Sequence, residues 1–116
     1  MELDIEKLAS KSAEQIYNEF VKYYGLIDNG DMEAVWEGID SYDYFVINCS
    51  PGTQQIWVAK QIYLHEKTNR ISCIDTIYFN IDSFNILKMK KHLDELYKKY
   101  RFCREQIKLN QINGMF

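Results

Sequence analysis

The sequence predicts an α+β fold in the order α-α-β-β-β-α, with a three-stranded antiparallel meander packed against two long helices and one short helix. Three observations favour this fold. Apolar residues recur every three or four positions over 4–27 and 82–109, as on the buried face of a helix. Between these segments, runs rich in β-branched and aromatic residues alternate with period two, and short turn sequences separate them. The 116 residues contain no repeat or linker, so one domain is expected.

The first helix is expected over 4–27, where Asp4 can cap its start and Asn29-Gly30 can end it in a left-handed turn. Its apolar face comprises Ile5, Leu8, Ala9, Ala13, Ile16, Phe20, Tyr24 and Ile27. A short second helix is expected over 32–39, with Asp31 as its N-cap. The buried side of this short helix would hold Met32, Val35, Trp36 and Ile39.

Three strands are expected over about 43–49, 54–65 and 70–81. The sequences "SPGT" and "EKTN" between them are short enough for hairpin loops, so the strands should pair antiparallel. With four-residue loops, the predicted partners are Ile47–Ile56, Phe45–Val58, Leu64–Ile71, Ile62–Cys73 and Val58–Ile77. Cys49 and Cys73 then point to the apolar face of the sheet, where a thiol acts as a small hydrophobic group.

The last helix is expected to begin after a cap at Asp82 or Ser83 and to run to about residue 109. Its apolar residues form a heptad seam: Ile86, Met89, Leu93, Leu96, Tyr100, Cys103 and Ile107. This seam either packs on the sheet or serves as a dimer interface.

The opposite face of the predicted sheet is aromatic and amide-rich but almost uncharged. It carries Tyr44, Val46, Asn48, Gln55, Trp57, Ala59, Tyr63, Ile74, Thr76, Tyr78 and Asn80. Either the N-terminal helix covers this face, or it is exposed and binds a protein or a second copy of the chain. A nucleic-acid stacking platform would normally add Lys or Arg around such aromatic residues.

One row of the predicted core face interrupts the apolar pattern with charge. The register places Asp43, Lys60 and Asp75 side by side. We expect a structural cross-strand ion pair in which these charges compensate one another. The alternative is a functional carboxylate–lysine–carboxylate site.

Charge is divided unevenly along the chain, whose net charge is −3. Residues 1–43 hold eleven acids and three lysines, and the remaining residues hold eleven bases and six acids. Six carboxylates without a base occupy residues 28–43: Asp28, Asp31, Glu33, Glu37, Asp40 and Asp43. They form either a solvated rim or a patch that imitates phosphates and binds a basic nucleic-acid-binding protein.

The last helix is basic and supports an alternative function. Lys90, Lys91, Lys98, Lys99, Arg101 and Arg104 are its candidate phosphate contacts. In that case the protein is a homodimeric nucleic-acid-binding regulator. However, Asp94 and Glu95 stand four residues before Lys98 and Lys99, the orientation that favours ion pairs along a solvated helix face.

Catalytic patterns are not recognisable in the sequence. The two histidines have no nucleophile or carboxylate at a familiar spacing, and no glycine-rich phosphate loop or metal-ligand pattern occurs. We therefore expect no enzyme activity, cofactor or metal. The three cysteines fit no disulfide framework, the N-terminus is not a signal peptide, and no apolar run is long enough for a membrane span. These features predict a cytoplasmic protein with free thiols.

The function expected from these features is that of a small non-catalytic inhibitor that binds a host protein. Abundant Ile, Lys, Asn and Tyr indicate A/T-rich coding sequence and hence a phage or mobile element of a low-GC bacterium. An anti-CRISPR or anti-restriction protein acting in the host cytoplasm is the most concrete version. The expected contacts are the six carboxylates of 28–43 together with Tyr44, Trp57, Tyr63 and Tyr78.

Overall fold

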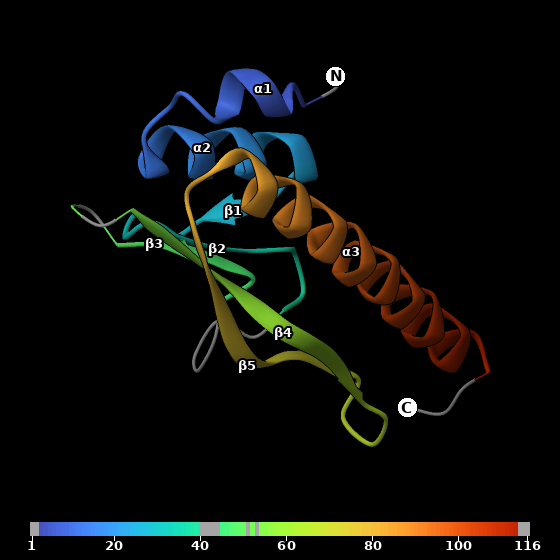
Figure 1. Ribbon diagram of the computed structural model, residues 1–116. Coiled ribbons are helices and arrows are strands. Elements are labelled where there is room, and N and C mark those ends of the chain that lie inside the picture. Colours follow the sequence, from blue (N-terminus) through green and yellow to red (C-terminus); the bar gives the residue numbers. More distant parts are fainter. Residues whose placement is uncertain (1–2, 40–44, 51, 53, 114–116) are drawn as a thin grey trace.

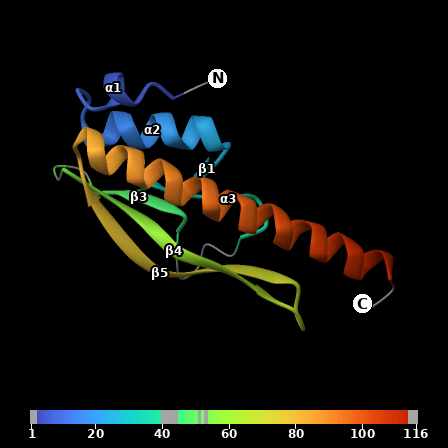
Figure 2. The same cartoon turned by 45° about the vertical axis from the view of Figure 1, so that its right-hand side comes forward.

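The computed structural model describes residues 3–39, 45–50, 52 and 54–113, and it has an α+β fold. The elements are α1 (Ile5–Leu8), α2 (Ala13–Tyr24), β1 (Ile27–Asp28), β2 (Glu33–Val35), β3 (Ile47–Cys49), β4 (Gln55–His65), β5 (Arg70–Asn80) and α3 (Ser83–Ile112). The strands form one antiparallel sheet in the order β1-β2-β3-β4-β5. All three helices lie on one side of it (Figures 1 and 2). The α+β class is confirmed, but the sheet has five strands instead of the expected three.

The predicted helix over 4–27 is divided into two helices at Ser12. The Ser12 hydroxyl accepts a hydrogen bond from the Gln15 backbone N–H, and the Gln15 side chain accepts one from the Ser12 backbone N–H. This reciprocal capping box satisfies donors that a continuous helix would use internally, so it starts a new helix at Ala13.

Helix α2 ends at Tyr24, three residues before the predicted end at residue 27. Gly25 adopts φ +65°, and the Leu26 backbone N–H donates to the Val21 carbonyl at 2.9 Å. This left-handed cap stops the helix at Tyr24. Ile27 therefore lies in β1 and is exposed, and not on the buried face of a helix as predicted.

The short helix predicted over 32–39 is wrong, because Glu33–Val35 form strand β2. A helix of about two turns gains few hydrogen bonds, whereas this strand pairs with β1 on one side and β3 on the other. Trp36 is buried all the same, and its indole N–H donates to the Tyr24 carbonyl at 2.8 Å. Its ring stacks on Tyr100 of α3, with the ring centroids 5.0 Å apart.

The predicted register of β4 with β5 is confirmed, including Leu64–Ile71, Ile62–Cys73 and Val58–Ile77, although Lys60 and Asp75 do not pair in the ladder. The pairing of β3 with β4 is shifted by two residues, so that Ile47 lies opposite Val58 and Cys49 opposite Ile56. Because side chains alternate with period two, this shift leaves every residue on its predicted face.

Helix α3 is the longest element, with 30 residues, and Asp82 caps it as predicted by accepting from the Asn85 backbone N–H. Its heptad seam is turned toward the sheet: Ile86, Met89, Leu93, Leu96, Tyr100 and Cys103 are buried, and Ile107 packs against the core. The seam is therefore unavailable as a dimer interface. Among the described residues, no helix combines the length and apolar character required to cross a membrane.

Polar contacts fix α3 to its neighbours. The Tyr24 hydroxyl donates to Asp94 at 2.6 Å, and Asp94 also accepts from the Lys90 ammonium at 2.9 Å. Burial and this carboxylate raise the pKa of Tyr24 above its ordinary value. On the sheet side, the His92 Nε2 donates to the Ala59 carbonyl at 2.7 Å. These bonds hold α2, α3 and β4 in a fixed arrangement.

Candidate protein-binding surface

The outer face of the sheet, defined here as the face opposite the helices, carries a continuous row of side chains across four strands. Glu33 of β2 is the partner of Asn48, Asn48 is the partner of Trp57, and Trp57 is the partner of Tyr78. Directly opposite residues in an antiparallel sheet point to the same face. The row therefore places a carboxylate, an amide and two aromatic rings side by side.

Aromatic side chains dominate the open part of this outer face. The rings of Trp57 and Tyr78 lie 5.1 Å apart between centroids. Tyr78 is 54% exposed, Tyr63 is 50% exposed and Ile74 is 37% exposed. We call these four residues the aromatic patch. Because α1, α2 and α3 all lie on the other side of the sheet, none of these helices covers the patch (Figure 2).

The aromatic patch is smaller than the face that the sequence predicts. Val46 and Ala59 belong to that face by alternation, yet both are fully buried. Tyr44, another expected contact, lies outside the described residues. The available surface is therefore centred on β4 and β5, around the Trp57–Tyr78 pair.

The acidic segment is partly explained by local structure. Asp28 accepts from the Tyr17 hydroxyl at 2.6 Å and from the Gly30 backbone N–H at 2.5 Å, which shapes the turn between β1 and β2. Burial and the Asp28 carboxylate raise the pKa of Tyr17 above its ordinary value. Glu33 accepts from the Asn29 side chain at 3.3 Å. Asp28 and Glu33 thus have structural partners as well as charge.

The other acidic candidates are distributed differently. Asp31 and Glu37 are exposed, and Asp40 and Asp43 lie outside the described residues. The Glu37 backbone carbonyl accepts from the Tyr100 hydroxyl at 2.6 Å, which places this residue beside α3. Of the described acids, Glu33 belongs to the row that includes the aromatic pair.

The ion pair predicted between Lys60 and Asp75 is not formed in the part of the chain that the structure describes. The ion pairs found there are Lys11–Glu19, Lys90–Asp94, Lys98–Glu95 and Lys108–Glu105. Lys60 and Asp75 are both exposed, and the third predicted member, Asp43, lies outside the described residues. Asp75 has φ +58°, and this left-handed conformation interrupts the β4–β5 ladder where the pair was expected.

The basic residues of α3 have partners on their own helix or nearby. Lys90 and Lys98 form ion pairs with Asp94 and Glu95 at 2.9 and 3.7 Å. The Lys99 ammonium lies over the Phe102 ring at 5.3 Å, and the Arg101 guanidinium lies over the Tyr97 ring at 5.9 Å. The Arg104 guanidinium occupies the space beside Gly38. Lys91 is exposed. These interactions are typical of a solvated helix that also anchors a loop.

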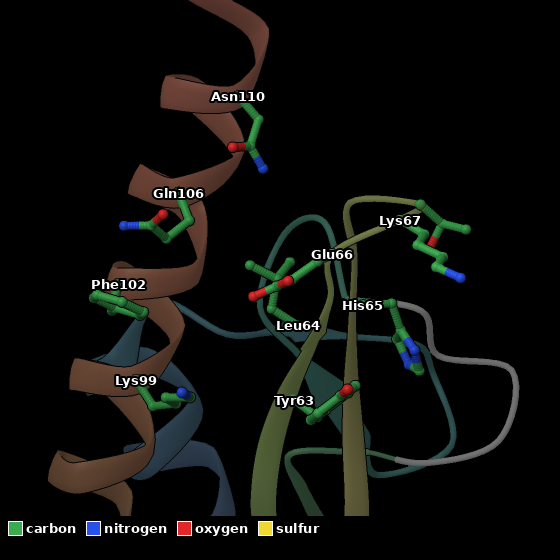
Figure 3. Close-up of a pocket in the computed structure, with 10 residues that line it drawn as sticks. Tyr63, Leu64, His65, Glu66, Lys67, Lys99, Phe102, Gln106 and Asn110 are labelled. Atoms are coloured by element: carbon green, nitrogen blue, oxygen red, sulfur yellow. The ribbon is translucent and has the colours of Figure 1, made fainter. Parts of the chain in front are cut away.

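A cleft of about 830 Å³ separates the end of the β4–β5 hairpin from the C-terminal half of α3 (Figure 3). Its lining comprises Tyr63, Leu64, His65, Glu66, Lys67, Thr68, Lys99, Phe102, Gln106 and Asn110. The Leu64 and Glu66 side chains point toward the helix, as Figure 3 shows. The Asn110 amide donates to Asn69 at 3.1 Å and connects the two walls. The cleft mixes charges of both signs with apolar groups and contains no cluster typical of one reaction.

Candidate nucleophiles in the described residues are poorly placed for catalysis. Cys49, Cys73 and Cys103 are all buried, and none of them forms a disulfide. Their burial confirms the inward direction predicted for Cys49 and Cys73. Burial raises the pKa of Cys73 to about 12. The His65 Nε2 lies 3.1 Å from the Ser72 hydroxyl, but this exposed pair has no carboxylate among its described contacts. Within the described ranges, no group of three or more His, Cys, Asp or Glu residues could hold a metal ion.

Comparisons with known proteins give no relative for this chain. No protein-family profile matches it, no curated protein matches it, and no solved structure matches it. The outer face of the sheet is therefore the main basis for assigning a function.

The sequence pattern misplaces one member of this face. It predicts Glu33 in a short helix, which would separate this residue from the strands that carry Trp57 and Tyr78. The structure shows strand-like alternation over "EAV", where Ala34 is buried between two half-buried neighbours, but the residue types themselves do not alternate between polar and apolar. Three residues are too few for this alternation to be distinguished from one helical turn.

Proposed function

We propose that this protein is a small non-catalytic protein-binding inhibitor that occupies its partner through the outer face of the sheet. The observation that carries the proposal is the row from Glu33 through Asn48 and Trp57 to Tyr78. It combines the half-buried Trp57 and the exposed Tyr78 with polar groups at its margin. Protein interfaces of this kind have aromatic anchors at the centre and a polar rim.

The chemistry of the patch favours a protein partner. Trp57 and Tyr78 offer large, rigid surfaces, and aromatic residues are enriched among those that carry binding energy. Binding of a nucleic acid would require cations that neutralise its phosphates. Glu33, the carboxylate of the row, would instead repel the phosphates. A basic protein surface would be attracted by the same carboxylate.

The most concrete form of this proposal is an anti-defence protein of a phage or mobile element. Its partner would be a basic, nucleic-acid-binding host protein, as expected for an anti-CRISPR or anti-restriction inhibitor in the host cytoplasm. The acidic segment 28–43 and the residue composition support this version. Asp31 and Glu37 are exposed and could contact such a partner.

The alternative is a nucleic-acid-binding regulator that uses the basic residues of α3. Binding through these residues would compete with the ion pairs and ring contacts that they already make. A gel-shift titration at several salt concentrations distinguishes the two functions. Nucleic-acid binding requires an affinity that falls steeply with salt and that weakens when Lys98, Lys99 or Arg101 is replaced.

A matched set of variants tests the proposed function. The Tyr78→Arg substitution places a cation in the aromatic patch, and Glu33→Lys reverses the charge of the same row. Lys22→Glu changes an exposed residue of α2, which lies in neither proposed interface, and serves as the control. We expect the first two variants to lose the ability to bind a basic host protein. They should also no longer inhibit the host defence that blocks phage infection. The control should retain both. Equal behaviour of all three variants would refute the proposal.

A further inference from the structure

Helix α3 has an outer stripe of exposed apolar and charged residues that faces away from the sheet. Five of the large exposed hydrophobic side chains of the described chain lie on this helix: Phe84 (66%), Leu87 (43%), Phe102 (55%), Leu109 (48%) and Ile112 (79%). At about 100° per residue, they project within about 40° of a common direction, opposite the buried seam. Apolar residues in these positions favour contact with another surface.

Six residues on this side of α3 are placed symmetrically about Lys98, whereas the fifth apolar residue of the outer stripe, Phe102, corresponds to Asp94. Leu87 and Leu109 lie eleven residues before and after Lys98, and Phe84 and Ile112 lie fourteen residues before and after it. Lys91 and Glu105 lie seven residues on either side. At these six positions, reversal of the helix direction matches apolar with apolar residues and matches a lysine with a glutamate.

We propose that the outer stripe of α3 binds the same stripe of a second copy of this chain, with the two helices antiparallel. The two-fold axis passes near Lys98. Leu87 then packs on Leu109 of the second copy, Phe84 packs on Ile112, and Lys91 faces Glu105. Each contact occurs twice, as a two-fold interface requires.

The dimensions of α3 allow this arrangement. From Phe84 to Ile112 the helix rises about 42 Å at ~1.5 Å per residue, so the apolar clusters at its two ends are well separated. In the antiparallel pair, the apolar cluster at each end of one helix would pack against the cluster at the opposite end of the other helix. The Lys98 ammonium lies 3.7 Å from Glu95 of its own helix, which offsets the repulsion between the two lysines at the axis.

The charge pattern distinguishes a second copy from an unrelated partner. To bind this stripe, a helix of an unrelated protein would need apolar residues at its ends and one charged residue. Such a partner would not explain why Lys91 and Glu105 lie at equal distances from Lys98. Glu105 also lies 3.7 Å from Lys108, and both side chains are largely exposed and free to rearrange. This interface uses neither the aromatic patch nor Glu33, so it is independent of the proposed function.

Molar mass in solution gives the first test. Light scattering coupled to gel filtration should show twice the mass of the 13.9 kDa chain at micromolar concentrations. Leu87→Asp and Leu109→Asp should each weaken dimerisation at least tenfold. Ile27→Asp changes an equally exposed apolar residue on β1 and should leave the dimer intact. A single-chain mass at 100 μM for the unmodified protein would overturn the proposal.

Charge exchange tests the pairing. Lys91→Glu and Glu105→Lys should each weaken the dimer, because each places like charges opposite one another. The double variant should recover most of the lost affinity, because it restores opposite charges in the reversed order. Failure of the double variant to recover would contradict the Lys91–Glu105 contact.

Cysteine cross-linking tests the helix direction in a way that does not depend on affinity. Lys98→Cys lies at the axis and should form an intermolecular disulfide with itself. Leu87→Cys should not cross-link with itself but should cross-link when mixed with Leu109→Cys. The three native cysteines are buried and should not compete. Self-cross-linking of Leu87→Cys would indicate parallel helices and overturn the proposal.

Discussion

Trp57 and Tyr78 are direct cross-strand partners on β4 and β5, and their ring centroids lie 5.1 Å apart on the outer face of the sheet. Such a pair stabilises a sheet modestly, by about 0.5–1.5 kcal/mol beyond area burial. More than half of the Tyr78 side chain is nevertheless exposed. Because the two rings are already in contact and Tyr78 is exposed to solvent, the pair is suited to binding a partner protein.

The accessibility of the two tryptophans provides a first prediction. Trp36 is 2% exposed and Trp57 is half-buried, so acrylamide should quench Trp57 more strongly. The Trp57→Phe variant should show a clearly smaller quenching constant than the unmodified protein. Tyr78→Phe, which keeps both tryptophans, is the control. Equal quenching in all three proteins would show that the outer face is covered.

The contact between Gly38 and Arg104 gives a second prediction. Gly38 has φ +86°, and a Cβ atom there would collide with the Arg104 guanidinium. Gly38→Ala should lower the free energy of unfolding by about 1–3 kcal/mol, because strain and displacement of Arg104 both oppose it. Gly30 has φ +99° with nothing near its Cβ position. Gly30→Ala should therefore cost less in urea unfolding, and an equal cost would contradict this account of Gly38.

Lys60 and Asp75 give a third prediction. In a double-mutant cycle with Lys60→Ala and Asp75→Ala, the coupling energy should lie close to zero, below about 0.3 kcal/mol. Asp75→Gly should stabilise the protein by about 0.5–1 kcal/mol, because glycine adopts φ +58° without strain. A coupling energy above about 1 kcal/mol would restore the ion pair predicted from the sequence.

The fourth prediction concerns the free energy of unfolding at alkaline pH, which should fall because the thiol of Cys73 is buried in its neutral form. The pKa of Cys73 is about 12 in the folded protein and about 9 as an ordinary thiol. This stabilising contribution is complete below pH 9 and is lost as pH rises toward 12, with a slope of about 1.4 kcal/mol per pH unit. In urea unfolding between pH 7 and 10.5, Cys73→Ala should lose stability less steeply than the unmodified protein. Parallel slopes would contradict a neutral, buried Cys73.

The fifth prediction concerns the bond between Tyr24 and Asp94. Tyr24→Phe removes a donor and leaves the partly buried Asp94 carboxylate with the Lys90 ammonium as its remaining described partner. We expect a loss of about 1–3 kcal/mol in the free energy of unfolding. Tyr63→Phe removes a hydroxyl from an exposed ring and should cost less than about 0.5 kcal/mol. The difference between these two variants measures the bond.

Long periodic segments were predictable from the sequence. The stripe from Ile86 to Ile107 and the alternation of β4 and β5 extend over enough residues to define element, face and register. The pair Leu64–Ile71 follows directly from the four-residue loop between these strands.

Short segments were not predictable, because tertiary contacts decide them. Glu33–Val35 is a strand because β1 and β3 pair with it on both sides, and local propensity does not include those partners. The division at Ser12 depends on a capping box whose residues can equally lie within a longer helix. The left-handed conformation of Asp75 could not be read from the pattern, and it lies at the position where the predicted ion pair is not formed.

The central claim is that the outer face of the sheet binds a partner protein, and site-specific photo-cross-linking tests it most directly. A benzophenone amino acid at position 78 reports on the aromatic patch, and the same group at position 88 reports on α3. In host cells, we predict one cross-linked basic protein from position 78 and its absence from position 88. Addition of Glu33→Lys should abolish that product. Cross-linking of the basic protein from position 88 alone, or persistence of the position 78 product with Glu33→Lys, would contradict the claim.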